Sequence, residues 1–426
     1  MTTQHVTILL LDLTFIILLA RLLGALARRL GQPAVIGEVL AGVFVLPLLV
    51  NNGIGAELFP ATIRVVLAAL ANLGVALFMF IVGMELDGRL LKGKGRTAVA
   101  VSMSCIVLPL LLGTALAVGL ADAHAPQRRS GFIVFIAVAL SITAFPVLAR
   151  ILADRGMQHT PVGGLALTAA AVNDVLAWLL LATAVALAGG GTGQHWLVLL
   201  ILPYLAVMIW VVKPLLRRIR LRRGRLTGGT LAAIVAGLLL SAAVTELIGL
   251  HLIFGAFMFG VIMPRKTSTG GVIDQVHDRI AGLNSVLLLP IFFIVAGLKV
   301  DLSAFSTTGL GELAVILAAA IGGKFIGAYA AARWSGMPSR RAAALGTLMN
   351  TRGLTELIVL SIGLELGLLD VRLYTLMVVM AIVTTAMAGP LLSLIYPQRF
   401  IAEDSAEPPA VAVERPAEPV HAGSWD

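Results

Sequence analysis

The sequence predicts an all-α, polytopic membrane protein with about thirteen transmembrane helices. Hydrophobic residues make up 59% of the chain and charged residues only 12%, whereas a soluble domain carries about 25% charged residues. The mean hydropathy is +1.00. Apolar runs of about 20 residues, the length that crosses a bilayer, recur from one end to the other. This composition excludes a soluble globular enzyme, a disordered protein and a nucleic-acid-binding domain, although the net charge is +9.

The apolar runs define the spans in order. They lie near residues 6–24, 34–50, 64–83, 98–120, 131–153, 162–188, 195–215, 229–248, 250–264, 283–298, 313–333, 342–366 and 372–396. The first run is too long for a cleaved signal peptide and carries Asp12 and Arg21. We expect one transmembrane domain over residues 1–400. Residues 401–426, rich in Glu, Pro and Ala, are expected to form a disordered cytoplasmic tail with no nucleotide-binding domain.

Basic residues gather in alternate loops. These hold Arg28 and Arg29; Arg89 to Arg96; Arg150 and Arg155; Lys213 to Arg225; Arg265 to Arg279; and Arg340 and Arg341. Under the positive-inside rule, these loops face the cytoplasm. With an odd number of spans, the N-terminus is then outside the cytoplasmic membrane and the C-terminus is in the cytoplasm.

The sixth span contains AAAVNDVLAW, which places Asn173 and Asp174 at mid-membrane. An ionisable residue in hydrocarbon is costly and is therefore a functional candidate. The Asp174 carboxylate could take up a proton and release it when a cation arrives. The Asn173 carbonyl adds a neutral oxygen ligand that suits Na⁺ or K⁺. The alternative is that Asp174 only hydrogen-bonds a neighbouring helix.

The fifth span contains SITAFPVLAR. Pro146 lacks an amide donor and clashes with the carbonyl four residues earlier, so the helix must bend or unwind around Thr143. The hydroxyls of Ser141 and Thr143, together with freed carbonyls, would then face the gap. Broken helices at mid-membrane commonly build ion sites in secondary transporters. A simple proline kink remains the alternative.

The twelfth span contains LMNTRGLTELIVL. Asn350, Thr351 and Gly353 are weak helix formers, which predicts a second interruption. Arg352 and Glu356 are four residues apart and therefore lie on one helical face. This pair could gate the site, or it could only neutralise itself and hold two helices together.

The eleventh span buries Lys324 in IGGKFIG. A buried ammonium either loses its proton or finds a carboxylate or carbonyl partners. Lys324 could compete with an incoming cation for Asp174. It could instead hold the two broken helices by hydrogen-bonding their loose carbonyls. The two interrupted spans are seven apart, an odd number, which gives them opposite topology. This layout is typical of inverted repeats whose broken helices cross at the midplane.

Several strings together resemble the cation/proton antiporter superfamily. They are GQPAVIGEVLAG, ALSITAFPVLARILAD, AAAVNDVLAW, LIFGAFMFGVIMP, LLLPIFFIVAGLKVD and LMNTRGLTELIVLSIG. The likeness runs from about residue 10 to 395. It is greatest to the second branch, the monovalent cation/proton exchangers that include plant and bacterial K⁺(Na⁺)/H⁺ exchangers.

The resemblance implies a thirteen-helix fold that works as a homodimer by elevator-like alternating access. Core transport helices would lie at about 98–188 and 313–396, and the remaining helices would form a dimerisation scaffold. Asp174 would bind cation and proton in turn, with Asn173 beside it.

The same resemblance assigns the interrupted helices. Thr143 falls on one unwound helix and Asn350 to Gly353 on the other, with Lys324 and Arg352 as the basic residues near them. Electrogenic relatives carry two adjacent aspartates where this chain has Asn173 and Asp174. One-for-one, electroneutral exchange is therefore the simpler expectation.

We therefore expect a transporter, not an enzyme, that exchanges K⁺ or Na⁺ for H⁺. The expected partners are the two exchanged ions, the lipid bilayer and a second copy of the chain, with no cofactor and no resident metal. Two alternatives remain open: proton-coupled transport of another solute, and a membrane-embedded enzyme or sensor that reuses the fold.

Overall fold

The computed structural model describes residues 3–45, 59–85, 96–124, 129–158, 160–188, 200–219, 226–264 and 272–406. Within these ranges the secondary structure is helical, and no strand occurs. Each of the thirteen predicted spans contains a helix. Of the helices in the described ranges, nine are individually long and apolar enough to cross a membrane. The prediction of an all-α, multi-pass membrane protein is confirmed.

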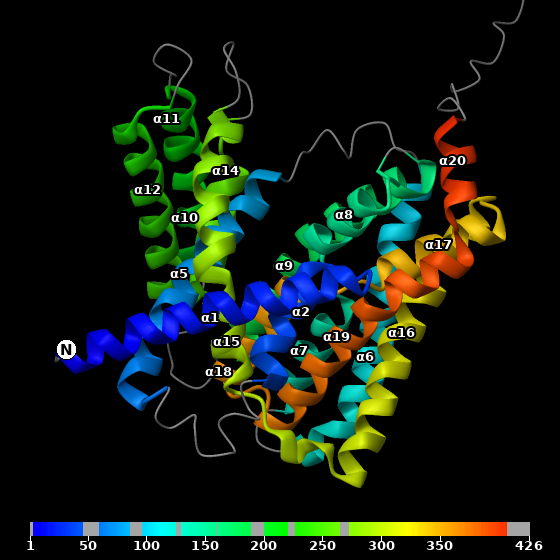
Figure 1. Ribbon diagram of the computed structural model, residues 1–426. Helices are drawn as coiled ribbons and strands as arrows, with labels where there is room; N and C mark the ends of the chain where they lie inside the picture. The colour runs from blue at the N-terminus through cyan, green and yellow to red at the C-terminus, as the bar shows by residue number, and fades with distance from the viewer. Residues whose placement is uncertain are drawn as a thin grey trace, which may run out of the picture.

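The helices pack as two groups. Figure 1 shows much of the first group on the left and much of the second on the right, with the N-terminal helix running across between them. The first, here called the scaffold group, packs around α5 and α15. It consists of α1 (Thr3–Arg29), α2 (Ala34–Leu40), the π-helical turn Ala41–Val45, α5 (Ala61–Glu85), α10 (Ile201–Val207), the π-helical turn Met208–Val212, α11 (Lys213–Arg217), α12 (Gly228–Leu247), α13 (Leu252–Val261), α14 (Val272–Leu283), the π-helical turn Asn284–Leu288 and α15 (Leu289–Gly297).

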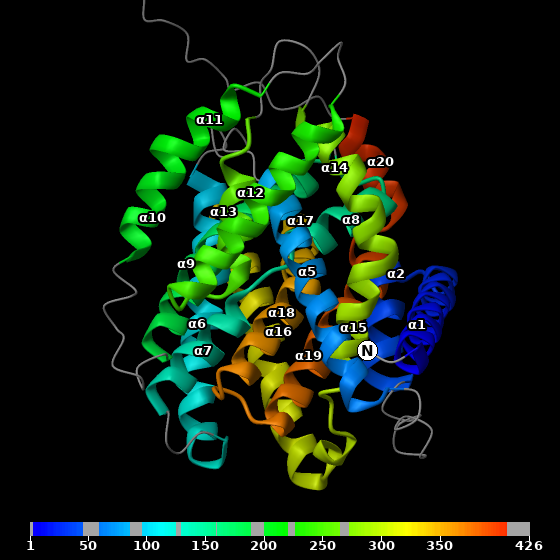
Figure 2. The ribbon, with the colours of Figure 1, turned by 90° about the vertical axis from the view of Figure 1, so that its left-hand side faces the viewer.

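The second, here called the core group, packs around α6 and α16. It consists of α6 (Arg96–His124), α7 (Arg129–Ser141), α8 (Phe145–Asp154), α9 (Pro161–Ala188), α16 (Thr307–Trp334), α17 (Ser339–Met349), α18 (Leu354–Glu365) and α19 (Val371–Ile395). The short 3₁₀ helix Leu302–Phe305 leads from α15 into α16, and α20 (Gln398–Ala406) follows α19. In Figure 2, α11 and α20 lie at the upper end of the molecule.

Two spans of the core group are interrupted where the sequence predicts. α7 ends at Ser141 and α8 begins at Phe145. Pro146 sits in the first turn of α8, where the amide that proline lacks would have no helical partner. α17 ends at Met349 and α18 begins at Leu354, so residues 350–353 form the second break.

Two boundaries differ from the prediction. The tenth span begins at Val272, not near residue 283, because α14 continues through a π-helical turn into α15. Val272, Val276 and Ile280 are buried at four-residue spacing while polar residues occupy the other face, so an amphipathic segment extends an apolar one. A sequence window tuned to apolar runs misses it.

The predicted start of a disordered tail at residue 401 is also wrong. α20 runs to Ala406, Ile401 is buried, and Asp404 pairs with Arg341 at 2.5 Å. The composition of this segment is mostly polar because only one face of the helix packs against α17, so composition alone did not predict a helix. The remainder of the predicted tail, residues 407–426, lies outside the described residues.

α5 and α13 approach each other through a pair of glycines. A Cβ on Gly83 would lie 2.3 Å from the Phe257 carbonyl oxygen and 3.0 Å from the Cα of Gly260. A Cβ on Gly260 would meet the Phe80 carbonyl oxygen at 2.2 Å. Hydrogen side chains at these two positions therefore let the backbones pack closely, as in many membrane helix pairs.

Gly83→Ala is expected to lower the free energy of unfolding by about 1–3 kcal/mol, because the added methyl group has no room. Thermal unfolding of the purified protein in detergent measures the loss. Gly119→Ala on α6 is the matched control, since a Cβ there has no neighbour within 4 Å. Equal midpoints of thermal unfolding for Gly83→Ala and Gly119→Ala would contradict the close approach of α5 and α13.

Candidate functional site

The two breaks hydrogen-bond to each other. The Ala144 amide donates to the Thr351 carbonyl at 3.3 Å. The Thr143 hydroxyl donates to the carbonyl of Met349, the last residue of α17, also at 3.3 Å. Each break thus satisfies backbone groups that the other leaves free, which is required where no water is available.

The last four carbonyls of α7 receive no hydrogen bond from amides of the same helix, as at any helix end. All four are hydrogen-bonded by side chains instead. Ser141 bonds the first through its own hydroxyl at 2.7 Å. Arg352 bonds the next two at 3.1 and 2.8 Å, and Lys324 bonds the fourth at 2.5 Å. The four carbonyls belong to Val138, Ala139, Leu140 and Ser141. Two cationic side chains therefore cap the negative end of this half-helix.

Lys324 comes from α16 and is fully buried. Besides the Ser141 carbonyl, its ammonium contacts the Thr143 hydroxyl at 2.5 Å. Within the described residues, no ion pair joins Lys324 to Asp174. Of the two roles that the sequence left open for Lys324, this geometry favours holding the broken helix.

Arg352 is buried together with Glu356, and their ion pair measures 3.0 Å. Its backbone is fixed by Thr385 of α19, whose hydroxyl accepts from the Arg352 amide at 2.9 Å and donates to its carbonyl at 2.8 Å. The pair is therefore self-neutralising and also tied to α7. Both features favour a structural role.

Asn173 and Asp174 lie on α9 beside the first break, and both are buried. The Asn173 amide nitrogen lies 3.4 Å from the Thr143 hydroxyl. The Asp174 carboxylate accepts a hydrogen bond from the Phe145 amide, at the positive end of α8. Oδ2 of Asp174 and Oδ1 of Asn173 have no hydrogen-bond partner among the described residues. Other buried polar atoms of the described residues lack a partner too, Asn350 Oδ1 among them, but Asp174 Oδ2 belongs to an ionisable group at mid-membrane that can take up a proton or a cation.

The other predicted residues occupy the second break. Thr351 bonds back to Leu348 at 2.8 Å. The Asn350 amide nitrogen lies 3.9 Å from the Met387 sulfur of α19, and its Oδ1 has no hydrogen-bond partner among the described residues. Gly353 packs against α8, because a Cβ there would come within 2.3 Å of a Val147 methyl group.

Two features near Asp174, one on the scaffold group and one on α9, were not predicted as parts of the site. Glu85, the last residue of α5, interacts electrostatically with Asp174 and lies 3.7 Å from His277. Trp178, one helical turn beyond Asp174, packs on the rings of Phe254 and Phe257 at 6.3 and 6.1 Å. No local pattern could have found Glu85, because its position at a loop boundary resembles a solvated helix end.

Comparisons with known proteins identify the family and the fold. Residues 15–396 match the transmembrane region of the sodium/hydrogen exchanger family. The chain is 40% identical over 409 residues to the Na(+)/H(+) antiporter NhaS4 of Synechocystis sp., covering 93% of this chain and 99% of that protein.

More distant relatives are longer than this chain. It is 39% identical over 400 residues to cation/H(+) antiporter 17 of Arabidopsis thaliana and 31% identical over 417 residues to K(+)/H(+) antiporter 1 of Saccharomyces cerevisiae. The matches cover 91% and 94% of this chain but only 48% and 47% of those proteins.

The fold also matches a solved structure. The sodium proton antiporter MjNhaP1 of Methanocaldococcus jannaschii superposes with a TM-score of 0.53 at 13% identity, covering 94% of this chain and 98% of that one. At that identity the likeness establishes the fold alone.

Arg352→Met is expected to cost about 3–5 kcal/mol of stability, because it leaves the Glu356 carboxylate buried without its partner. The double variant Arg352→Met/Glu356→Leu removes both charges and should recover only the part of that loss that comes from the unpaired carboxylate, because the Ala139 and Leu140 carbonyls stay without their Arg352 donor. Detergent melting curves of the three proteins measure the difference. A double variant as unstable as the single one would show that the pair is not the cause.

Proposed function

Because the chain belongs to the sodium/hydrogen exchanger family, we propose that it is a secondary transporter, and not an enzyme, that exchanges Na⁺ or K⁺ for H⁺. Asp174 is the proposed exchange group. The observation that carries this proposal is the pair of buried oxygens, Asp174 Oδ2 and Asn173 Oδ1, that lack a hydrogen-bond partner among the described residues beside the crossing of two broken helices.

The proposed cycle alternates a proton and a cation at one carboxylate. When the proton leaves Asp174, the ionised group has a negative charge that must be compensated in this buried place. Lys324 acts on Asp174 electrostatically, but it is hydrogen-bonded to Ser141 and Thr143 and forms no ion pair with Asp174 among the described residues, so a cation can supply the charge. The carbonyl oxygen of Asn173 offers a second, neutral ligand. One proton is thereby exchanged for one cation.

Two arguments support Na⁺ or K⁺ as the exchanged cation: the chemistry of the ligands and the names of the relatives. Carboxylate and amide oxygens are hard ligands that suit both alkali ions. The relatives' names include Na⁺/H⁺, cation/H⁺ and K⁺/H⁺ antiporters. Glu85 adds negative charge on the scaffold side of Asp174, which would raise the local concentration of cations.

Access from the two sides of the membrane is proposed to alternate as the core group moves against the scaffold group. Polar ties between the groups are few in the described residues. They include Lys299–Glu365 at 2.9 Å, Tyr374 to the Ala296 carbonyl at 3.0 Å and Gln32 to the Ala386 carbonyl at 3.0 Å. We also propose a homodimer assembled through the scaffold group, as the resemblance implies.

The proposed location is the cytoplasmic membrane, with the N-terminus outside and the C-terminus inside. The arginine-bearing end of α8, the end of α11 and α20 lie toward the same side in Figures 1 and 2. The positive-inside rule assigns that side to the cytoplasm.

Asp174→Asn is expected to abolish exchange, because an amide cannot release a proton. In everted vesicles with a preset pH gradient and a pH-sensitive dye, Na⁺ or K⁺ should collapse the gradient only with the wild-type protein. Asp122→Asn, which changes an exposed carboxylate at the end of α6, should retain full activity. A folded wild type that is silent to Li⁺, Na⁺, K⁺ and Rb⁺ would refute the proposal.

One-for-one exchange predicts no net charge movement per cycle. Proteoliposomes on a solid-supported membrane should give no transient current when Na⁺ or K⁺ is added, although an enclosed pH dye reports exchange. A current that scales with the dye signal would show that more protons than cations move.

A further inference from the structure

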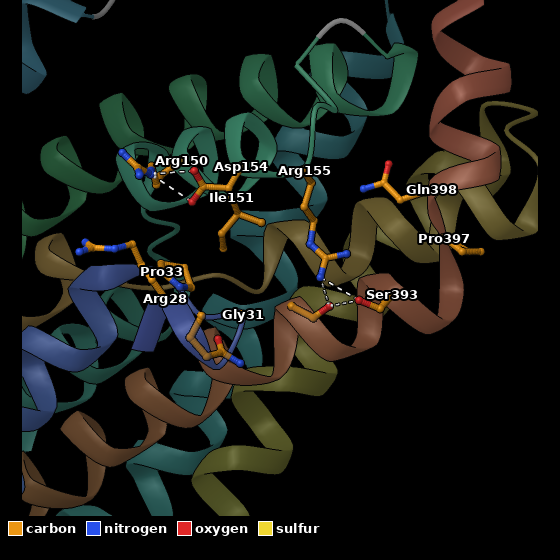
Figure 3. Close-up of a pocket in the computed structure, with 12 residues that line it drawn as sticks. Arg28, Gly31, Pro33, Arg150, Ile151, Asp154, Arg155, Ser393, Pro397 and Gln398 are labelled. Carbon is orange, nitrogen blue, oxygen red and sulfur yellow. Dashed lines mark hydrogen bonds and ion pairs between the residues drawn. The ribbon is translucent and has the colours of Figure 1, made fainter. Parts of the chain in front are cut away.

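A cavity lies where the two helix groups meet, on the side proposed to face the cytoplasm. Its volume is about 570 Å³. Figure 3 shows α8 on one side of it and, on the other, α19 and the turn between α1 and α2. Both helix groups therefore supply its walls.

The lining is strongly basic. It contains three arginines, Arg28, Arg150 and Arg155, and a single acidic residue, Asp154. Arg150 pairs with Asp154 at 3.0 Å in an exposed setting. In the view of Figure 3, Arg28 and Arg150 lie toward the same end of the cavity. The charge left after this pairing is positive.

Arg155 has a positioning role at this cavity. Its guanidinium donates to the Gly389 carbonyl at 2.5 Å and to the Ser393 hydroxyl at 2.9 Å, so it holds the end of α8 to α19. Partial burial lowers the pKa of Arg155, but an arginine stays protonated at physiological pH. Its charge therefore adds to those of Arg28 and Arg150.

Asp174 is not among the residues that line this cavity. Asp174 meets the first residue of α8, Phe145, whereas the cavity is lined by residues 150 to 155 at the other end. At a rise of 1.5 Å per residue the two places are roughly 10 Å apart along the helix. Positive charge in the lining would repel Na⁺ or K⁺, in contrast to Glu85 beside Asp174.

We propose that this cavity binds a phosphate-type oxyanion, carried by an anionic lipid headgroup or by a soluble phosphate compound, with Arg28 and Arg150 as its principal ligands. Guanidinium groups bind phosphate through paired hydrogen bonds and keep their charge when partly desolvated. The volume is in the range of known small-molecule sites.

A lipid could reach the cavity along α1. Leu22 and Leu26 on this helix, and Leu30 directly after it, are exposed at four-residue spacing and end beside Arg28. Such a stripe would accommodate an acyl chain while the headgroup phosphate enters the cavity. A soluble phosphate would enter from the aqueous side.

A ligand bound here touches both helix groups and therefore stabilises the state in which they are together. Because a ligand shifts a conformational equilibrium toward the state that it binds better, it would slow exchange. This consequence rests on the proposed exchange function, but the binding itself does not.

The test is a binding measurement on the full chain in nanodiscs. One arm replaces part of the phosphatidylcholine with phosphatidylglycerol. The other keeps phosphatidylcholine and titrates inorganic phosphate. The midpoint of thermal unfolding should rise with one or both probes, and the probe that acts identifies the source. Arg28→Gln/Arg150→Gln should weaken the apparent affinity at least about tenfold, and Arg28→Lys/Arg150→Lys should restore part of it.

Arg217→Gln/Arg218→Gln is the matched control. It removes two exposed positive charges from the end of α11, away from the cavity, and should bind as the wild type does. Two results would overturn the proposal: a wild-type midpoint that responds to neither probe, or equal loss of affinity in the cavity and control variants. Because the readout is binding, failure of the exchange proposal would leave this result interpretable.

Discussion

Capping of α7 by Lys324 and Arg352 is the interaction on which the rest of the structure depends. A helix that ends in the middle of a membrane leaves carbonyls that water cannot reach, at a cost of several kcal/mol each. The two buried cations and the Ser141 hydroxyl satisfy all four. The break can therefore persist, and α8 can begin with its amide end directed at Asp174.

In this arrangement Lys324, Arg352 and Glu356 make structural contacts, and Asp174 does not take part in them. Glu356 balances Arg352, and Lys324 is held by a carbonyl and a hydroxyl. Asp174 is thereby left without a tight cationic partner among the described residues. In the proposed function, that freedom allows the carboxylate to exchange a proton for a metal ion. Thr143 connects the parts, because its hydroxyl contacts Lys324, Asn173 and the Met349 carbonyl.

The sequence predicted the features that arise from local chemistry. Pro146 forbids a continuous helix, and the weak helix formers Asn350, Thr351 and Gly353 predict the second break. A carboxylate at position 174 stands out in an apolar run, so the buried acid could be located as well. The sequence could not decide whether Lys324 competes with a cation for Asp174 or holds the broken helix, because the partners of Lys324 lie more than 180 residues away in the chain. Glu85 and the cavity of Arg28 and Arg150 were missed for the same reason. They depend on how the two helix groups meet, which no local pattern encodes.

The central claim is that one buried acid trades its proton for a cation, and counting protons tests it most directly. Purified protein in weakly buffered detergent solution is titrated with Na⁺ or K⁺ while the pH is recorded and cation binding is measured by calorimetry. The account predicts one proton released for each cation bound, and neither event in Asp174→Asn. Cation binding without proton release in the wild type would contradict it.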